Sequence, residues 1–122
     1  MNKFVVMFCV FTGIVSPALA GSCETAAMNY YCTAVTLALG KASANSPLGT
    51  ALTKRAAMLD EEAKRLGYAD LKQRYYTAGV QDVGKAADPT VMERLIGTCV
   101  KSEPRFVQAF EATVTECDNV RN

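Results

Sequence analysis

Cysteine is the residue type that most constrains how this chain can fold. The sequence contains five cysteines, of which Cys9 lies in an apolar run close to the N-terminus. An even number of cysteines in the rest of a short chain is typical of exported proteins held together by disulfide bonds. We therefore expect a small fold with two disulfides, formed by the remaining four cysteines: Cys23, Cys32, Cys99 and Cys117.

The N-terminal residues have the layout of a secretory signal peptide. Lys3 supplies a positive charge, residues 4–15 form an apolar run, and small residues precede a cleavage site after Ala20. The run is too short to span a bilayer comfortably, since a transmembrane helix needs roughly 20 apolar residues. We therefore expect a signal peptide over residues 1–20 and a single periplasmic or secreted domain over residues 21–122, without a transmembrane segment. A leader retained as a membrane anchor is the alternative.

A second interpretation of this region makes Cys23 the acylated residue of a lipoprotein. The usual lipoprotein site has a bulky aliphatic residue three positions before the cysteine, but here Ala20 takes that position and Leu19 lies one residue earlier. Acylation of Cys23 would also leave an odd number of thiols in an oxidising compartment. We favour cleavage after Ala20 and a disulfide at Cys23, with acylation as the alternative.

Helix geometry limits how the four cysteines can pair. If Cys23 and Cys32 lie on one helix, their Cα atoms are about 13 Å apart, whereas a disulfide needs roughly 4.4–6.8 Å. A break near Pro104 would place Cys99 and Cys117 at different levels of a helical hairpin, more than about 10 Å apart along it. Two pairings remain, and we prefer the first because chain termini often lie close together: Cys23–Cys117 with Cys32–Cys99, or Cys23–Cys99 with Cys32–Cys117.

Apolar residues recur at helical spacing through most of residues 21–122, and no alternating pattern between hairpin turns indicates a strand. Ser22 and Gly40 are the expected cap and stop of a first helix over about residues 23–39, and Gly67 is the expected end of the second. Later helices are expected to begin at four signals, the last helix extending to Cys117: Ser46-Pro47, Asp70, Asp88-Pro89 and Pro104. We therefore expect an all-α fold, a small bundle of four to five short helices stapled by two disulfides.

The composition excludes several kinds of chemistry. The sequence contains no histidine, which removes Ser-His and Cys-His catalysis, histidine metal sites and a histidine pH switch. Oxidised cysteines would supply neither a thiolate nucleophile nor a metal site, and no phosphate-binding loop or dinucleotide motif is present. We predict no catalytic, cofactor-binding or metal-binding residue and no cofactor, and so a protein that is not an enzyme.

Charge gives no reason to expect binding to nucleic acid. The chain has 13 basic and 12 acidic side chains, and loss of Lys3 with the leader would leave the two signs balanced.

Carboxylates are the remaining basis for catalysis, and Asp60, Glu61 and Glu62 are adjacent in the sequence. Paired-carboxylate hydrolysis needs two such groups across a cleft, but adjacent helical positions fan outward. We interpret these three residues as a solvated helix face.

Two tyrosine doublets, Tyr30-Tyr31 and Tyr75-Tyr76, are the candidate partner-binding residues. Adjacent helical residues point about 100° apart, so we expect one tyrosine of each doublet in the core and the other near the surface. Exposed tyrosines are common in binding faces. The alternative is that these side chains lie at the rim of the core with a solvated hydroxyl.

The leader, the small mature domain and the disulfide-bonded helical fold resemble in layout the HdeA-type acid-stress chaperones, small periplasmic helical proteins of Gram-negative bacteria. The chain departs from that family in its four mature cysteines, since the family has a single disulfide. The resemblance implies a chaperone activity as one candidate function. It assigns no functional residue.

The sequence favours a non-enzymatic binding or inhibitory module that acts on a protein in the cell envelope or host, such as a cell-wall hydrolase. The missing catalytic residues and the doubly bridged frame support this prediction. A periplasmic acid-stress chaperone and a small carboxylate-dependent enzyme are the alternatives. The expected partner is a protein, and whether the chain also forms a homodimer stays open.

Overall fold

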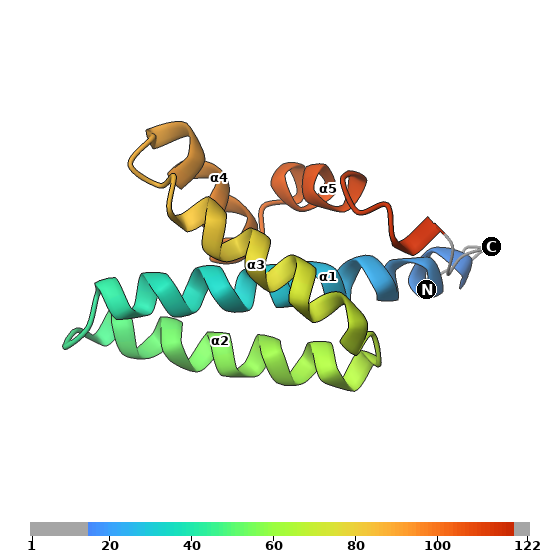
Figure 1. Cartoon of the computed structure of the whole chain (residues 1–122), viewed down its shortest axis with the longest axis horizontal. Coiled ribbons are helices and arrows are strands. Elements are labelled where there is room, and N and C mark those ends of the chain that lie inside the picture. The colour runs from blue at the N-terminus through green and yellow to red at the C-terminus, as the bar shows by residue number, and fades with distance from the viewer. Residues whose placement is uncertain (1–14, 119–122) are drawn as a thin grey trace, which may run out of the picture.

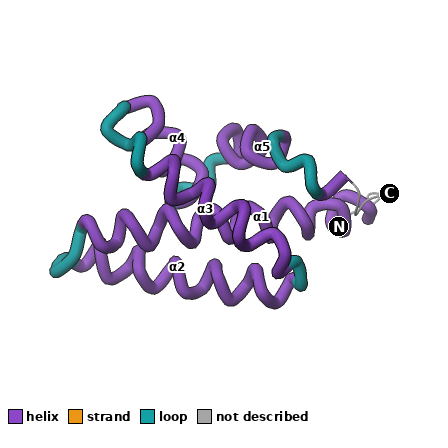
Figure 2. Tube along the Cα trace, viewed as in Figure 1, coloured by secondary structure: helices purple, strands orange, loops and turns teal. Residues whose placement is uncertain are grey.

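The computed structural model describes the backbone of residues 15–118 and the side chains of residues 21–118. Most of the expected signal peptide, including Cys9, lies outside the described residues. No helix within residues 15–118 is both long and apolar enough to cross a membrane. Every regular element in this range is a helix, which confirms the predicted all-α fold (Figure 1, Figure 2), in the order α1 Val15–Ala42, α2 Pro47–Leu66, a 3₁₀ turn η1 Ala69–Leu71, α3 Lys72–Val83, α4 Pro89–Cys99 and α5 Pro104–Ala112.

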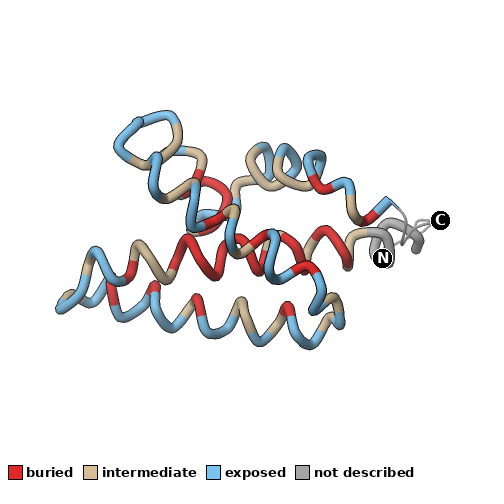
Figure 3. The backbone as a smooth tube through the Cα atoms, in the orientation of Figure 1, coloured by how far each residue is buried: buried red, intermediate tan, exposed pale blue. Residues whose placement is uncertain are grey.

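Helix α1 is the centre of the molecule, because α2 packs along one side of it, α3 crosses it, and α4 and α5 lie on the side opposite α2 (Figure 1). The middle of α1 is buried, including its polar residues (Figure 3). The hydroxyls of Thr33 and Thr36 donate to the carbonyl groups of Asn29 and Cys32 at 2.6 and 2.7 Å. These buried hydroxyls are therefore satisfied within the helix itself.

The predicted ends of the first helix, Ser22 and Gly40, are both wrong, because α1 runs through both residues. Gly40 lies where α1 and α2 pack closely, and a Cβ atom there would lie 2.7 Å from Thr53 Oγ1. On α2, a Cβ atom on Gly49 would lie 2.1 Å from the carbonyl oxygen of Ser43. These glycines allow two helix backbones to approach each other, so Gly40 is not a stop signal.

Helix α2 begins and ends where the sequence predicts. The Ser46 hydroxyl accepts a hydrogen bond from the Gly49 N–H at 3.0 Å, and Pro47 occupies the first turn. Gly67 ends the helix in the left-handed conformation, with φ of 89°. The face that α2 buries against α1 includes Leu52 and Ala63.

The predicted caps of the next two helices have different outcomes. Asp88 caps α4, since its carboxylate accepts a hydrogen bond from the Thr90 N–H at 2.9 Å. Asp70 is not a cap, because it lies inside η1, and α3 begins at Lys72 without a side-chain cap. The 3₁₀ turn leads directly into α3, so no extended residue precedes that helix.

Helix α5 begins at Pro104 as predicted, but it does not extend to Cys117. It ends at Ala112, and the Thr113 hydroxyl donates to the carbonyl of Phe110 at 2.7 Å. Such side-chain bonds to nearby carbonyl groups compete with the helical ladder. The chain after α5 is therefore irregular where it returns to α1.

Two disulfides join α1 to residues 89–118, which we call the C-terminal arm. Cys23 pairs with Cys117 at a Cα–Cα distance of 5.7 Å, and Cys32 pairs with Cys99 at 5.1 Å. The preferred pairing is therefore confirmed, and the alternative pairing is wrong. All four cysteines are buried, so the bridges hold the arm against α1 from inside the core.

Candidate functional site

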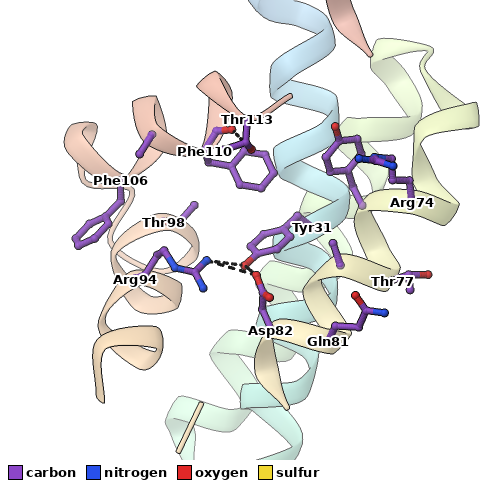
Figure 4. A pocket seen from close by; sticks show the side chains of 13 residues that line it. Tyr31, Arg74, Thr77, Gln81, Asp82, Arg94, Thr98, Phe106, Phe110 and Thr113 are labelled. Atoms are coloured by element: carbon purple, nitrogen blue, oxygen red, sulfur yellow. Dashed lines mark hydrogen bonds and ion pairs between the residues drawn. The ribbon is translucent and has the colours of Figure 1, made fainter. Parts of the chain in front are cut away.

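A cleft of about 650 Å³ opens between α3 on one side and α4 and α5 on the other. Helix α1 lies beneath it, and Tyr31 reaches up from α1 into the space between the walls (Figure 4). The two walls come from consecutive helices, whereas the floor comes from α1, far earlier in the sequence. The cleft exists because the disulfides hold the C-terminal arm beside α1 without packing α5 into the core, and no residue of α5 is fully buried.

Aromatic rings form the apolar part of the cleft. The ring centroids of Tyr31 and Phe110 are 4.8 Å apart, and Tyr75 meets Phe110 edge-on at 6.1 Å. Gly79 lets α3 come close to α1 at this point, since a Cβ atom there would lie 2.5 Å from the carbonyl oxygen of Tyr31. The cleft therefore offers aromatic surface from three different segments of the chain.

A polar cluster lies beside these rings. The Tyr31 hydroxyl donates to Asp82 Oδ2 on α3, and Arg94 Nη1 on α4 donates to the Tyr31 hydroxyl at 3.3 Å and to Asp82 Oδ2 at 3.4 Å. Figure 4 shows Arg94 reaching across the cleft to this pair. Burial, and then the hydrogen bond to Asp82, raise the pKa of Tyr31 above its ordinary value of 10.0. The hydroxyl therefore stays protonated and links both walls to α1.

A second cluster ties the end of the arm to α3. The Tyr75 hydroxyl donates to Glu116, and Arg74 forms an ion pair with the same carboxylate. Burial, and then the hydrogen bond to Glu116, raise the pKa of Tyr75 to about 12. The hydrogen bond from Tyr75 is the main cause that lowers the pKa of Glu116, and Arg74 adds to it. This carboxylate is therefore held in its charged form.

Thr98 is an unusual member of the α4 wall. Its side chain lines the cleft and the residue is only 4% exposed. Within the described part of the chain, its hydroxyl makes no hydrogen bond. Because the side chain borders the cleft, this hydroxyl is available to a ligand that enters it.

The structure separates the four predicted tyrosines. Both residues of the first doublet, Tyr30 and Tyr31, are buried, so the expectation that one of them lies near the surface is wrong. They are buried together because α1 is covered on opposite sides. In the second doublet Tyr75 is buried and Tyr76 is half-buried, as expected. Tyr31 and Tyr75 line the cleft, whereas Tyr76 lines a separate groove of about 390 Å³ between α2 and α3.

The sequence did not identify Asp82, Arg94, Thr98 or Phe110 as site residues. Each is a single polar or aromatic residue on a helix, without a motif around it. The Tyr31 hydroxyl and its partner Asp82 are 51 residues apart in the chain, and Arg94 is 63 residues from Tyr31. Only the fold brings them together, so no local spacing could reveal the cluster.

The three adjacent carboxylates of α2 lie away from the cleft. Glu61 is exposed as expected, but Asp60 is half-buried, lines the groove between α2 and α3 and has a buried Oδ1 atom, so the prediction of a solvated face is wrong for Asp60. Asp60 pairs with Lys64 at 3.0 Å and approaches Lys72 at 3.6 Å, while Glu62 pairs with Arg65. Asp82 is the carboxylate that lines the cleft. Within residues 15–118, no group of three or more histidine, cysteine or acidic side chains is placed to hold a metal ion.

Comparison with protein-family models, curated proteins and solved structures finds no match to this chain. The resemblance in layout to HdeA-type chaperones therefore stays an expectation. The geometry of the cleft and its surroundings is the basis for a functional proposal.

Proposed function

We propose that this protein is an exported, non-enzymatic binding module, and that the cleft receives part of a protein partner in the cell envelope or host. An inhibitory action on that partner, for example a cell-wall hydrolase, is the form of this function that we favour. The observation that carries the proposal is the cleft itself: aromatic surface beside the side chain of Thr98, whose hydroxyl makes no hydrogen bond among the described residues. Two disulfides, which form in oxidising compartments, support export.

The size and lining of the cleft fit a recognition site. Its volume of about 650 Å³ lies within the roughly 300–1,000 Å³ typical of ligand sites, which combine apolar walls with a few polar groups. Tyrosine, phenylalanine and arginine, the residue types enriched at protein interfaces, all line it. Packing against the core explains why the aromatic rings are partly buried. It does not explain why the space between the two walls of the cleft stays open.

The covalent frame also suits binding. Each wall of the cleft is attached to α1, the arm through two disulfides and α3 through its close approach at Gly79. A site whose walls are already in place loses less conformational entropy when a partner binds. A rigid cleft without a second carboxylate in its lining therefore supports recognition better than catalysis.

Capture of a partner from envelope extract tests the proposal, with two variants of α5 as the critical comparison. Ala109 lines the cleft and is exposed, so Ala109→Trp would fill the space without disturbing the core. Ala112 is exposed on the same helix but does not line the cleft, so Ala112→Trp is the matched control. We expect the wild type and Ala112→Trp to capture the same partner and Ala109→Trp to lose it. Equal capture by all three would refute the cleft as the binding site.

One observation favours the acid-stress chaperone as a second candidate. Glu116 joins the end of the arm to α3 most strongly while it is charged, since its pKa is lowered in the folded state. Acid would therefore weaken this contact and expose the apolar face beneath the arm. If the protein captures no partner but prevents aggregation of unfolded proteins at low pH, this second function replaces the first.

A further inference from the structure

We propose that the group received by the cleft is the free C-terminal carboxylate of the partner, carried on a residue with a large apolar side chain. This inference rests on the proposed function, since it specifies which part of a partner protein enters. The chemistry required is a carboxylate and an apolar group on the same residue.

The α4 wall presents two hydrogen-bond donors to the same region of the cleft. Arg94 and Thr98 are four residues apart on one helix, so they lie on the same face one turn apart. Figure 4 shows both on the wall that faces α1 and α3. Guanidinium and hydroxyl groups can both donate to one carboxylate.

Neither donor is fully used inside the protein. The Thr98 hydroxyl makes no hydrogen bond among residues 21–118, although the residue is 4% exposed. Arg94 makes its contacts there through Nη1 alone, and its side chain is 44% exposed. Nε and Nη2 of Arg94 are therefore available, and a guanidinium edge with two N–H groups matches the geometry of a carboxylate.

The charges around the cleft form two ion pairs, and one cation keeps an unused edge. The lining of the cleft contains two guanidinium groups, Arg74 and Arg94, and one carboxylate, Asp82. Asp82 accepts hydrogen bonds from Tyr31 and Arg94, so part of its charge is compensated before a ligand arrives. Glu116, outside the lining, pairs with Arg74, and Asp82 pairs with Arg94 Nη1 at 3.4 Å. The Nε and Nη2 groups of Arg94 are therefore the part of a cation that an incoming carboxylate can reach.

The position of the aromatic rings is the reason to expect a large apolar side chain on the C-terminal residue of the partner. The Tyr31 hydroxyl contacts Arg94 at 3.3 Å, and the ring of the same tyrosine packs against Phe110 at 4.8 Å between centroids. The cation and the aromatic surface are therefore separated by only the length of one tyrosine ring. A C-terminal residue matches this arrangement because its carboxylate and its side chain are attached to the same Cα atom.

Short synthetic peptides test the inference by calorimetry on the oxidised wild-type protein. The first ends in phenylalanine with a free carboxylate, the second is its C-terminal amide, and the third ends in alanine with a free carboxylate. A fourth, amidated peptide carries an internal glutamate beside phenylalanine. We expect the first to bind about tenfold or more tighter than each of the others, as loss of a charged hydrogen-bond pair predicts. Equal binding of acid and amide would overturn the inference, and equal binding of the fourth peptide would overturn the C-terminal source.

Variants of the α4 wall test the assigned donors. Arg94→Gln should weaken binding of the acid peptide by about 10- to 100-fold, and Thr98→Val, which keeps the side-chain shape, by roughly three- to tenfold. Neither should weaken the amide peptide to the same extent. Arg65→Gln on α2 is the matched control, since Arg65 pairs with Glu62 outside the cleft and should leave binding unchanged. If Arg94→Gln does not fold, Thr98→Val alone decides, and unchanged acid binding in that variant contradicts the assignment.

The two proposals fail in different ways. If Ala109→Trp abolishes capture of the partner but no peptide binds, the cleft is a binding site and the C-terminal carboxylate is the wrong ligand. If acid and amide peptides bind equally and Ala109→Trp blocks both, the cleft is again a binding site, but it does not recognise a C-terminal carboxylate. If Ala109→Trp changes neither partner capture nor peptide binding, both proposals are wrong.

Discussion

Single residues decide how closely the helices of this protein approach one another. At Gly79 a side chain would collide with the backbone of α1, at 2.5 Å from the Tyr31 carbonyl oxygen and 2.9 Å from Ala34 Cβ. The close approach brings α3, and with it Asp82, to the tyrosine that forms the floor of the cleft. The site therefore depends on a residue that contributes no side chain to it.

The variant Gly79→Ala tests this dependence. We expect it to lower the free energy of unfolding by about 1–3 kcal/mol, because the added methyl group overpacks the contact between two backbones. Gly21→Ala is the matched control, since a Cβ atom there meets nothing within 4 Å inside α1, and it should be neutral or slightly stabilising. Chemical denaturation of both variants gives the comparison, and equal stability would contradict the close approach.

The hydroxyl of Tyr31 is a second residue whose contribution can be measured. Tyr31→Phe removes the hydrogen bond to Asp82 and leaves the ring in place against Phe110. We expect it to lower the free energy of unfolding by about 1.5–3 kcal/mol, as for a bond to a charged group. Tyr76→Phe should have little effect, since the Tyr76 hydroxyl makes no hydrogen bond among the described residues. A Tyr31→Phe protein as stable as Tyr76→Phe would show that the bond contributes nothing.

At this scale the sequence predicted the cysteine partners but not the polar cluster. Helix spacing left two ways to pair Cys23 and Cys32, and the proximity of chain ends favoured the pairing that the structure shows. Asp82 and Arg94 carry no such constraint, because a lone charged residue on a helix is usually solvated. Their positions depend on how α3 and α4 cross α1, which the local sequence does not encode.

Among the helices, α5 is attached most lightly, because none of its residues is fully buried. Phe110 contacts Tyr31 and Tyr75, and Phe106 lies against Gly97 of α4. Beyond α5, Glu116 connects the chain to Tyr75 and Arg74. We therefore expect the arm to loosen before α1 and α2 separate.

The pH dependence of the arm follows from Glu116. Its folded-state pKa is below the ordinary value of 4.5, mainly through the hydrogen bond from Tyr75. A carboxylate with a lowered pKa contributes stability that is present above the unfolded-state value and is lost as pH falls through the folded-state value. We expect the near-ultraviolet circular dichroism of the tyrosines to change as the pH falls below about 4.5, and the change to be smaller in Glu116→Gln. Glu61→Gln, exposed on α2, is the control, and an unchanged spectrum down to pH 2 would contradict the acid-sensitive contact.

The ends of the helices show which local signals are dependable. Ser46-Pro47 and Asp88-Pro89 mark helix starts correctly, because a side-chain acceptor and a fixed proline φ act within a few residues. Gly40 misled the prediction because glycine serves either to end a helix or to allow close packing. The difference lies in what packs against it, here Thr53 on α2, and that is tertiary information.

On the scale of the whole molecule, two disulfides connect α1 to the C-terminal arm, one at the end of α4 and one close to the end of the arm. The bonded cysteines are 94 and 67 residues apart in the chain, so each bridge closes a long loop. The fold class was predictable because helical periodicity is a property of the sequence alone, and cysteine spacing reduced the possible pairings to two. The cleft could not be predicted from the sequence. It is the space that remains because the arm lies beside α1 and α3 without packing fully against them.

Removal of one bridge tests its role in the frame. We expect the double variant Cys32→Ser, Cys99→Ser to unfold with a free energy lower by about 2–5 kcal/mol. Peptide binding should weaken as well, because this bridge holds the end of α4 that carries Thr98. The matched control is oxidised wild-type protein in the same buffer. A variant that is destabilised but binds with full affinity would show that the cleft does not need this bridge.

Nuclear magnetic resonance mapping of the bound partner is the most direct measurement of where this protein binds. With labelled oxidised protein and the captured partner, we expect the largest chemical-shift changes at residues on the two walls and floor of the cleft, including Asp82, Thr98 and Phe110. Residues on the outer face of α2, such as the exposed Met58, should change little. Changes concentrated on α2, or in the groove lined by Tyr76, would contradict the proposal that the cleft is the binding site.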